Sequence, residues 1–201
     1  MHLTNNSFAF LKRFVLPALL IAGALFKFSV GYAAPVCEEL FLEAPSIAQS
    51  SLFQNELQLL EKRYGAKLNL EQDQSPRGLK YLTLADSRNG RTVGELNYRY
   101  NEADQNLSIL WMESFVKQMG IARALVGAAL SAHPGTAKVS TEVLVDTNES
   151  LVKAALARGS TVEMAVQETA VFKISASFGF NKLVPDSINS EYGFTAVRSG
   201  K

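Results

Sequence analysis

The stretch that decides how this chain folds is residues 116–131, VKQMGIARALVGAALS, which follows NLSILWMESF and stops at HPG. Its apolar residues recur at helical spacing, so a helix is predicted from about Gly120 to Ala132, ended by Pro134 and Gly135. The residues before it alternate as in a strand, and AKVSTEVLVD after it does the same. A strand, a helix and a strand over residues 107–146 predict a parallel crossover.

The flanking sequence predicts a mostly antiparallel sheet around this crossover. Residues 67–72 and 79–100 alternate apolar and polar side chains, and Asn89-Gly90 is a strong hairpin signal. A turn at NEADQN leads into the strand before residue 116, and residues 180–188 and 191–199 are predicted as closing strands. Helices are predicted at residues 46–64, 148–158 and 160–178, the last opening with Ser160 and Glu163 at capping-box spacing. The predicted fold class is therefore mixed α/β, with a largely antiparallel sheet.

The composition indicates one globular domain. The 201 residues are 47% hydrophobic and 19% charged, which gives no support to wholesale disorder. Three basic residues and no acidic residue fall in residues 1–33, so the net charge of +1 becomes about −2 for the remainder. A remainder of this charge does not indicate nucleic-acid binding, and no nucleic-acid partner is expected.

The N-terminus reads as a targeting segment. Lys12 and Arg13 precede the uncharged run FVLPALLIAGALF. The small residues Gly31 and Ala33 follow this run and form a plausible cleavage site. This layout predicts a signal peptide over residues 1–33 and export to the periplasm or the medium. The alternative is an uncleaved membrane anchor over residues 14–36, which would be the only membrane contact of the chain. After it we expect an N-terminal segment with an amphipathic helix at 34–66 and the main domain at 67–201.

Several kinds of active site are excluded by residue counts. The only histidines are His2 and His133, and Cys37 is the only cysteine. A Ser-His-Asp or Cys-His site and a zinc site are therefore not expected, and His133 is predicted to face solvent at a helix end. No Walker or dinucleotide glycine fingerprint is present. Cys37 is predicted to be a free thiol.

The front of the opening stretch, KQMGIA, has two interpretations. The first residues of a helix leave backbone amides without intrahelical partners, and the helix dipole adds partial positive charge, so such an end can bind an anion. Gly120 and Ala122 add little bulk, and Lys117 and Arg123 can supply full charges. The other interpretation is a plain buried helix packed on a sheet through residues such as Ile121.

Three motifs in order resemble the GNAT superfamily of acyl-CoA N-acyltransferases. Residues 117–122, KQMGIA, are similar to the R/Q-x-x-G-x-G/A pyrophosphate loop of that family and lie between the fourth strand and the next helix. The hairpin through Asn89-Gly90 resembles the second and third strands of the family. AVFKISASFGF resembles a later helix that ends in a GF signature, here at Phe178 to Phe180.

The resemblance implies acyl transfer from coenzyme A to an amine, without a metal. Loop amides would bind the pyrophosphate, and a backbone amide around Met112 would bind the acyl carbonyl. The implied acceptor is a small molecule or a protein amine, and Glu113 and Glu95 are the candidate bases. The implied cofactor-binding residues are Met112, Lys117, Gln118, Gly120, Ile121, Ala122 and Arg123.

The sequence also departs from the family pattern. Lys117 replaces the Arg or Gln that the family usually has at the first position of the loop. Ser175 stands where many members have a tyrosine that acts as the acid for the thiolate, and a serine there would relay a proton only through water. Residues 149–167 are predicted to be an insertion, and Asn148 lies out of register with the usual Asn before the later helix. Two hypotheses follow: an acyl-CoA-dependent N-acyltransferase, or an exported GNAT-like binding protein without catalysis. Trp111 and Phe115 are predicted to be core residues.

Overall fold

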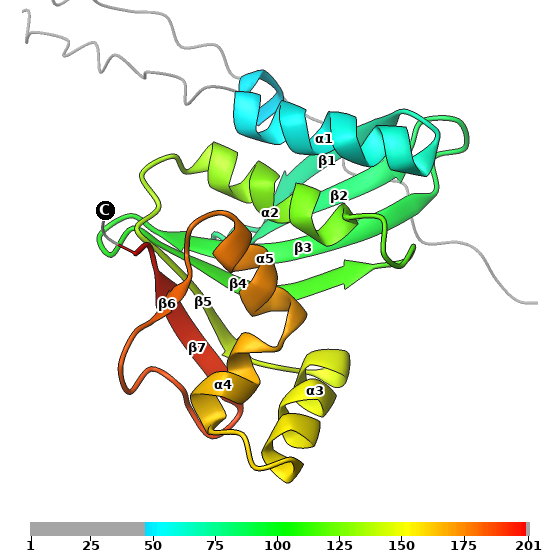
Figure 1. Ribbon diagram of the computed structural model, residues 1–201. Helices are drawn as coiled ribbons and strands as arrows, with labels where there is room; N and C mark the ends of the chain where they lie inside the picture. The colour runs from blue at the N-terminus through cyan, green and yellow to red at the C-terminus, as the bar shows by residue number, and fades with distance from the viewer. Residues whose placement is uncertain (1–46, 200–201) are drawn as a thin grey trace, which may run out of the picture. The chain divides into compact units, whose positions relative to one another are not determined.

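The computed structural model describes residues 47–199, in which a seven-stranded sheet carries a layer of helices (Figure 1). The signal or anchor segment and Cys37 lie outside these residues and stay predictions. The strands are β1 (Leu68–Gln74), β2 (Lys80–Asp86), β3 (Thr92–Asn101), β4 (Asn106–Ser114), β5 (Lys138–Val143), β6 (Lys182–Leu183) and β7 (Tyr192–Val197). The helices are η1 (Ile47–Gln49), α1 (Ser51–Tyr64), α2 (Ile121–Ala132), α3 (Asp146–Ala157), α4 (Val162–Gln167) and α5 (Ala170–Ser177).

The sheet has the strand order β1-β2-β3-β4-β5-β7-β6. Strands β1 to β4 form an antiparallel meander, and β5 pairs with β4 in parallel through the crossover helix α2. Strand β7 pairs antiparallel with β5 on one side and β6 on the other. The predicted mixed α/β class, with one parallel crossover in a mostly antiparallel sheet, is confirmed.

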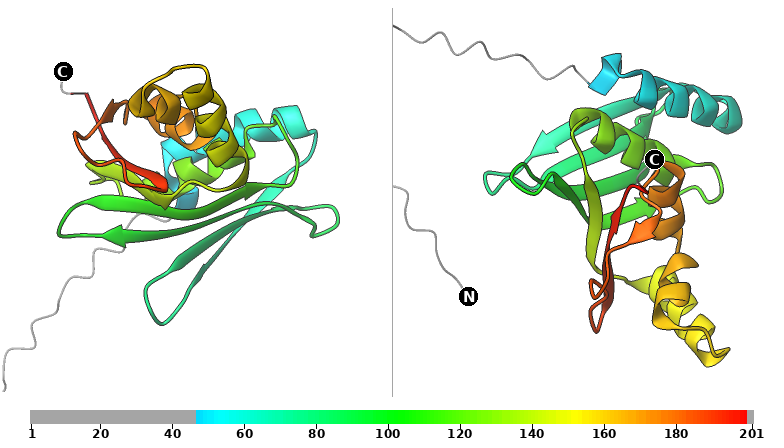
Figure 2. Two further views of the ribbon diagram at one scale, coloured as in Figure 1. Left: turned by 90° about the horizontal axis from the view of Figure 1, so that it is seen from below. Right: turned by 60° about the vertical axis from the view of Figure 1, so that its left-hand side comes forward.

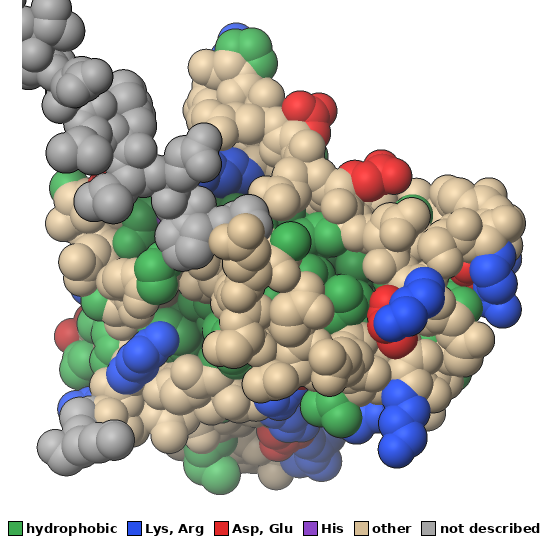
Figure 3. Space-filling view, turned by 90° about the horizontal axis from the view of Figure 1, so that it is seen from above, with side chains coloured by type: hydrophobic (Ala, Val, Ile, Leu, Met, Phe, Trp, Pro, Cys, Tyr) green, Lys and Arg blue, Asp and Glu red, His purple; other side chains and the backbone are tan. Residues whose placement is uncertain are grey.

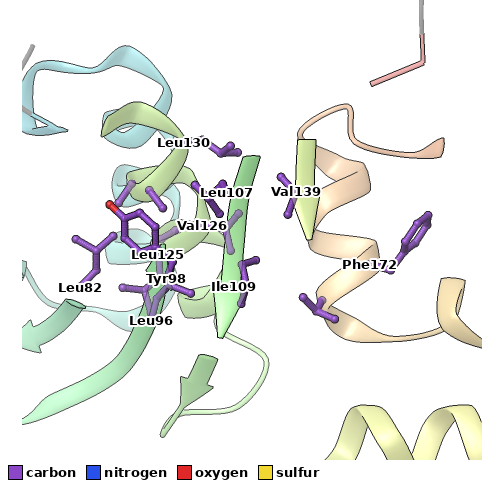
Figure 4. Packing of buried hydrophobic residues seen from close by; sticks show 14 of the residues in the cluster. Leu82, Leu96, Tyr98, Leu107, Ile109, Leu125, Val126, Leu130, Val139 and Phe172 are labelled. Carbon is purple, nitrogen blue, oxygen red and sulfur yellow. The ribbon is translucent and has the colours of Figure 1, made fainter. Parts of the chain in front are cut away.

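The described helices lie on one side of the sheet, as Figure 2 shows. Side chains alternate between the two faces of a strand, and the fully buried ones of β2 to β5 share the face that α2 covers. Figure 4 shows Leu82, Leu96, Tyr98, Leu107 and Ile109 of the strands gathered around Leu125 and Val126 of α2, with Val139 of β5 on the side of α5. Helix α2 is buried almost all round because α1 and α5 also pack against it.

Most predicted element boundaries are confirmed. Helix α1 ends at Gly65, which adopts a left-handed conformation with φ 78°, and the hairpin turns through Gly90. The cap predicted at Ser160 is wrong, because Thr161 is the N-cap and its side chain accepts the amide of Met164. The single helix predicted after it is two helices, since Thr169 starts α5 by accepting the amide of Phe172.

No helix within residues 47–199 is long and apolar enough to cross a membrane.

Candidate functional site

The loop between β4 and α2, residues 115–120, forms a tight turn over the sheet. Gln118 and Gly120 both have positive φ, at 62° and 91°, and Gly120 is the N-cap of α2. The first turn of α2 lies close to β3 because residue 94 is glycine. A Cβ there would lie 2.3 Å from Cγ2 of Ile121 and 3.0 Å from the carbonyl oxygen of Glu113.

The backbone amides of residues 116–123 have no hydrogen-bond partner among the described residues. The amide of Phe115 donates to Val93, and the next amide with a partner is that of Ala124, which donates to Gly120. Eight consecutive amides, residues 116–123, lie between these two. They include the amides predicted to bind pyrophosphate, those of Gln118 and Gly120 to Arg123. Unpaired amides at a helix N-terminus form a concentration of partial positive charge that suits an anion.

Strands β4 and β5 separate beside this loop. Their parallel pairing covers only residues 106–109 and 138–141. The amide of Phe115 donates to Val93 of β3, and backbone groups of alternate residues point to opposite sides of an antiparallel strand. The amides of Met112 and Ser114 therefore point away from β3 toward the gap, where no described strand pairs with them. Met112, the residue predicted to bind an acyl carbonyl, thus has a backbone amide without a partner among the described strands.

The two candidate bases lie directly opposite each other. Glu95 of β3 and Glu113 of β4 are Cα partners in the antiparallel ladder. Leu96 and Met112, the next pair, belong to the helix-covered core, so the two glutamates lie on the other face of the sheet. Glu113 is exposed and Glu95 is half-buried. The structure therefore brings the two candidates together, at the end of β4 that adjoins the loop.

The cations near the loop differ from those expected. Arg123 forms a double hydrogen bond with Glu56 of α1, at 2.7 and 2.8 Å, and its guanidinium lies 4.9 Å from the ring centre of Phe178. This pairing raises the pKa of Arg123 and occupies its charge, so only its amide is left for an anion. Lys117 is exposed in the loop.

A further cation reaches the loop from α1. Arg63 lies with its Nη1 3.3 Å from the position of a Cβ at Gly120, and both line a hollow between α1 and the loop. Among the described residues Arg63 forms no ion pair. Sequence reasoning missed Arg63 because this residue precedes the predicted domain. Its position in the last turn of an amphipathic helix could have been predicted from the sequence.

The relay role expected of Ser175 is not supported. Its side chain is fully buried, and its hydroxyl donates to the carbonyl of Val171 one turn earlier (2.9 Å). A hydroxyl that is buried and bonded to its own helix is not placed to exchange a proton with solvent. The GF signature has a backbone role instead: Gly179, with φ 94°, ends α5 while the amide of Phe180 donates to the carbonyl of Ser175.

Two features of the gap between β4 and β5 escaped sequence reasoning. Asn148 lines it and accepts a hydrogen bond from the amide of Ala170, so folding brings this residue to the start of α5 in spite of its distance in sequence. The sequence signal for this placement was the break at Gly159, because it ends α3 and lets α4 pack beside it. Trp111 and Phe115 were predicted to be core, which is wrong: they are 38% and 44% exposed.

His133 and Asp86 serve the fold away from this site. His133 is half-buried, not solvent-facing as predicted, because it stacks on Tyr100 at 3.9 Å. Burial and the nearby Lys80 lower its pKa to about 4. Asp86 is buried and receives bonds from Arg88 and Tyr64, which hold its pKa well below its usual range.

Within residues 47–199 no three His, Cys, Asp or Glu side chains are grouped so as to hold a metal ion.

No protein-family model matches the chain, and no curated protein matches it in sequence. Among the solved structures that are similar to it are three acetyl- or acyltransferases. A nourseothricin acetyltransferase has 13% identity and a TM-score of 0.32, over 65% of this chain and 82% of that chain. A cAMP-binding acyltransferase from Mycobacterium smegmatis has 10% identity and a TM-score of 0.36, over 77% of this chain and 56% of that chain. A ribosomal-protein-S5-alanine acetyltransferase from Vibrio fischeri has 12% identity and a TM-score of 0.34, over 74% and 88%.

The topology itself agrees with the motifs. The KQMGIA loop lies between the fourth strand and the crossover helix, the Asn89-Gly90 hairpin joins β2 and β3, and the GF signature ends α5. These are the positions that the family resemblance implied. The strand order and the places of these three segments therefore agree with the fold that the resemblance to the GNAT superfamily implied.

Proposed function

We propose that this protein transfers an acetyl or other acyl group from coenzyme A to an amine by direct attack. The observation that carries the proposal is the run of eight unpartnered amides at residues 116–123, next to a strand edge with a free amide at Met112. A pyrophosphate and an acyl carbonyl are the two groups of an acyl-CoA that need such donors. The loop and the gap supply both within one site.

Binding of the nucleotide end rests on the loop. Its amides and the dipole of α2 favour a negatively charged group, and two cations are available to add full charge. Lys117 belongs to the loop itself, and Arg63 reaches it from α1. Arg123 contributes through its amide because its side chain is paired with Glu56.

The chemical step uses the opposite face of the sheet. Glu113, or Glu95 beside it, accepts a proton from the acceptor ammonium, directly or through one water. The neutral amine then attacks the thioester carbonyl, and the amide of Met112 donates to the oxygen as negative charge develops. The C–S bond breaks as the carbonyl re-forms. The attacking nitrogen, now part of the new amide, releases its second proton to solvent, and the thiolate takes a proton from solvent. The base and the carbonyl donor come from adjacent residues: the side chain of Glu113 lies on the face away from α2, and the backbone amide of Met112 points into the gap beside β4.

Two observations favour a second candidate, a GNAT-like binding protein that has lost catalysis. Ser175 is buried, so the residue in the place of the family's usual acid cannot protonate the thiolate. The predicted signal peptide would place the chain outside the cytosol, where acyl-CoA is absent. We keep export to the periplasm or the medium, or anchoring by residues 14–36, as a proposal linked to this candidate.

Ligand binding and turnover separate the two candidates. The full-length protein is heated with and without coenzyme A or acetyl-CoA. A ligand at 100 times its Kd stabilises by about 2.7 kcal/mol, which raises Tm by several degrees. We expect such a shift, and thiol release that requires an added amine. No shift at millimolar ligand would refute the acyltransferase, and binding without turnover would favour the second candidate.

Matched variants test the roles within the site. We expect Glu113→Gln to lower kcat without weakening coenzyme A binding, because its side chain lies on the face away from α2. Glu102→Gln, in the exposed turn between β3 and β4, removes the same charge and serves as the control. Equal rates for both variants would exclude Glu113 as the base.

Localisation is tested independently with reporter fusions after residues 33 and 40. Reporter activity retained in the cytosol in both fusions would refute export.

A further inference from the structure

One face of the sheet is left bare by the described helices (Figure 2). On strands β1 to β4 this face carries two rows of directly opposed residues. The first row is Glu71, Thr83, Glu95 and Glu113, and the second is Asp73, Tyr81, Asn97 and Trp111. Four of these eight side chains are carboxylates and two are aromatic.

The glutamates in these rows lack a counter-charge. None of Glu71, Glu95 and Glu113 forms an ion pair within the described part of the chain. Glu95 and Glu113 are moreover directly opposite each other, a placement of like charges that disfavours a sheet. On the side seen in Figure 3, some acidic side chains lie against basic ones, at the right and at the bottom of the view, and others stand apart. The two rows themselves hold no cation; Arg99, exposed on the same face, follows two residues after Asn97. The negative charge of the rows therefore favours a cationic ligand.

An exposed aromatic residue joins this charged face to the gap between β4 and β5. Trp111 is 38% exposed, lies on the bare face two residues before Glu113, and also lines the gap together with Met112. A tryptophan face attracts ammonium and guanidinium groups, most strongly where water is partly excluded. The gap and the two rows thus form one continuous surface, with the free amide of Met112 at its inner end.

The length of the first row distinguishes a small amine from a polypeptide. Neighbouring strands lie about 4.7–4.9 Å apart, so Glu113 and Glu71, three strands apart, are separated by roughly 14 Å. A small amine held at Glu113 would leave Glu71 without a role. An extended peptide covers that distance with about four or five residues, at about 3.3 Å each.

We propose that the acceptor is a basic polypeptide segment that lies across β1 to β4 on the bare face. Its reacting amine sits beside Trp111 and Glu113, and a second Lys or Arg four or five residues away meets Glu71. The acceptor role rests on the proposed acyl transfer, whereas the binding of the basic segment does not.

The test uses Trp111 as its own probe, because it is the only tryptophan in the chain. Fluorescence of the full-length protein is titrated with an eight-residue peptide that carries Lys at positions 1 and 5, and with the same peptide carrying Gln instead. We expect saturable binding of the Lys peptide, weakened by added salt, and none of the Gln peptide. Equal binding of the two peptides would overturn the proposal.

A substitution in the first row tests whether the peptide reaches Glu71. We expect Glu71→Gln to weaken the Lys peptide about two- to fivefold, the range of one exposed ion pair, and to leave a single-charge amine such as butylamine unaffected. Glu163→Gln, an exposed acid on α4, is the matched control. An equal loss in the control, or no loss at Glu71, would overturn the polypeptide assignment. A loss at Glu71 as large for butylamine as for the peptide would also overturn it.

Failure of the proposed acyl transfer has a different signature. If coenzyme A gives no thermal shift while peptide binding still depends on Glu71, the acyltransferase is refuted and the docking surface stands. If coenzyme A binds and butylamine is acylated while the Lys peptide gains nothing from Glu71, the docking surface is refuted alone.

Discussion

Replacing Gly94 by Ala tests whether close contact between α2 and β3 sets the position of the loop. The new Cβ would lie 2.3 Å from Cγ2 of Ile121, whereas carbon atoms in good contact lie about 3.5–4.0 Å apart. The overlap exceeds an ångström, and the carbonyl oxygen of Glu113 at 3.0 Å blocks movement toward β4. Helix α2 must therefore shift outward. Overpacking of this kind costs about 1–3 kcal/mol.

Urea unfolding followed by circular dichroism measures this cost, and coenzyme A binding reports on the loop. We expect Gly94→Ala to lower the free energy of unfolding by about 1–3 kcal/mol and to weaken the ligand. Gly127→Ala is the control, because its Cβ would make ordinary contacts at 3.4 Å and alanine favours a helix. It should leave stability unchanged or raise it.

A double-mutant cycle identifies the clash. Ile121→Ala alone removes a buried side chain and is expected to cost about 2–5 kcal/mol. With the Ile121 side chain gone, Gly94→Ala should cost at least about 0.5 kcal/mol less than it does in the parent protein. Additive costs, or a Gly94→Ala protein as stable as the parent, would refute the reasoning.

Three further substitutions test the pairings near the loop and in the core. Glu56→Gln should destabilise by about 1 kcal/mol because it breaks a double ion pair, and by freeing the Arg123 guanidinium it should tighten coenzyme A binding; isothermal titration showing weaker binding would contradict this. His133 binds its proton less readily folded than unfolded, so its protonation disfavours folding and stability falls as pH drops from about 6.5 to about 4. In His133→Phe, the free energy of unfolding measured across that range should depend less steeply on pH than in the parent protein. An equally steep dependence would exclude the histidine as its cause. Ser175→Ala should keep kcat in the acyl-transfer assay, since the hydroxyl serves its own helix, and a tenfold loss of kcat would restore it to the mechanism.

Local patterns sufficed for most of the fold. The Asn89-Gly90 turn, the left-handed Gly65 and the apolar spacing of α2 act within a few residues, so the elements they predict are confirmed. The order of those elements along the chain then sufficed to predict the crossover and the position of the loop. Thr161 displaced Ser160 as the cap because both residues fit the cap statistics and only the path of the chain after Gly159 distinguishes them.

The site was predictable only in part, because its side chains depend on tertiary packing. The pairing of Glu95 with Glu113 follows from strand register, which the hairpin turns do not reveal on their own. The partner of Arg123 is Glu56, 67 residues away, so its charge could not be assigned from the loop sequence. Trp111 was taken for core because apolar residues usually are, yet β4 parts from β5 before reaching it.

The place of β7 in the sheet has a consequence for how the protein is made. This strand is the last one within residues 47–199, yet it lies between β5 and β6, and Phe194 and Ala196 on it are buried. The β1 to β4 meander can form from near neighbours while the rest of the chain is still being synthesised. The second half of the sheet must wait until β7 has been synthesised. A nascent chain therefore exposes an unpaired β5 edge until then, and a truncation that removes β7 would remove an internal strand of the sheet.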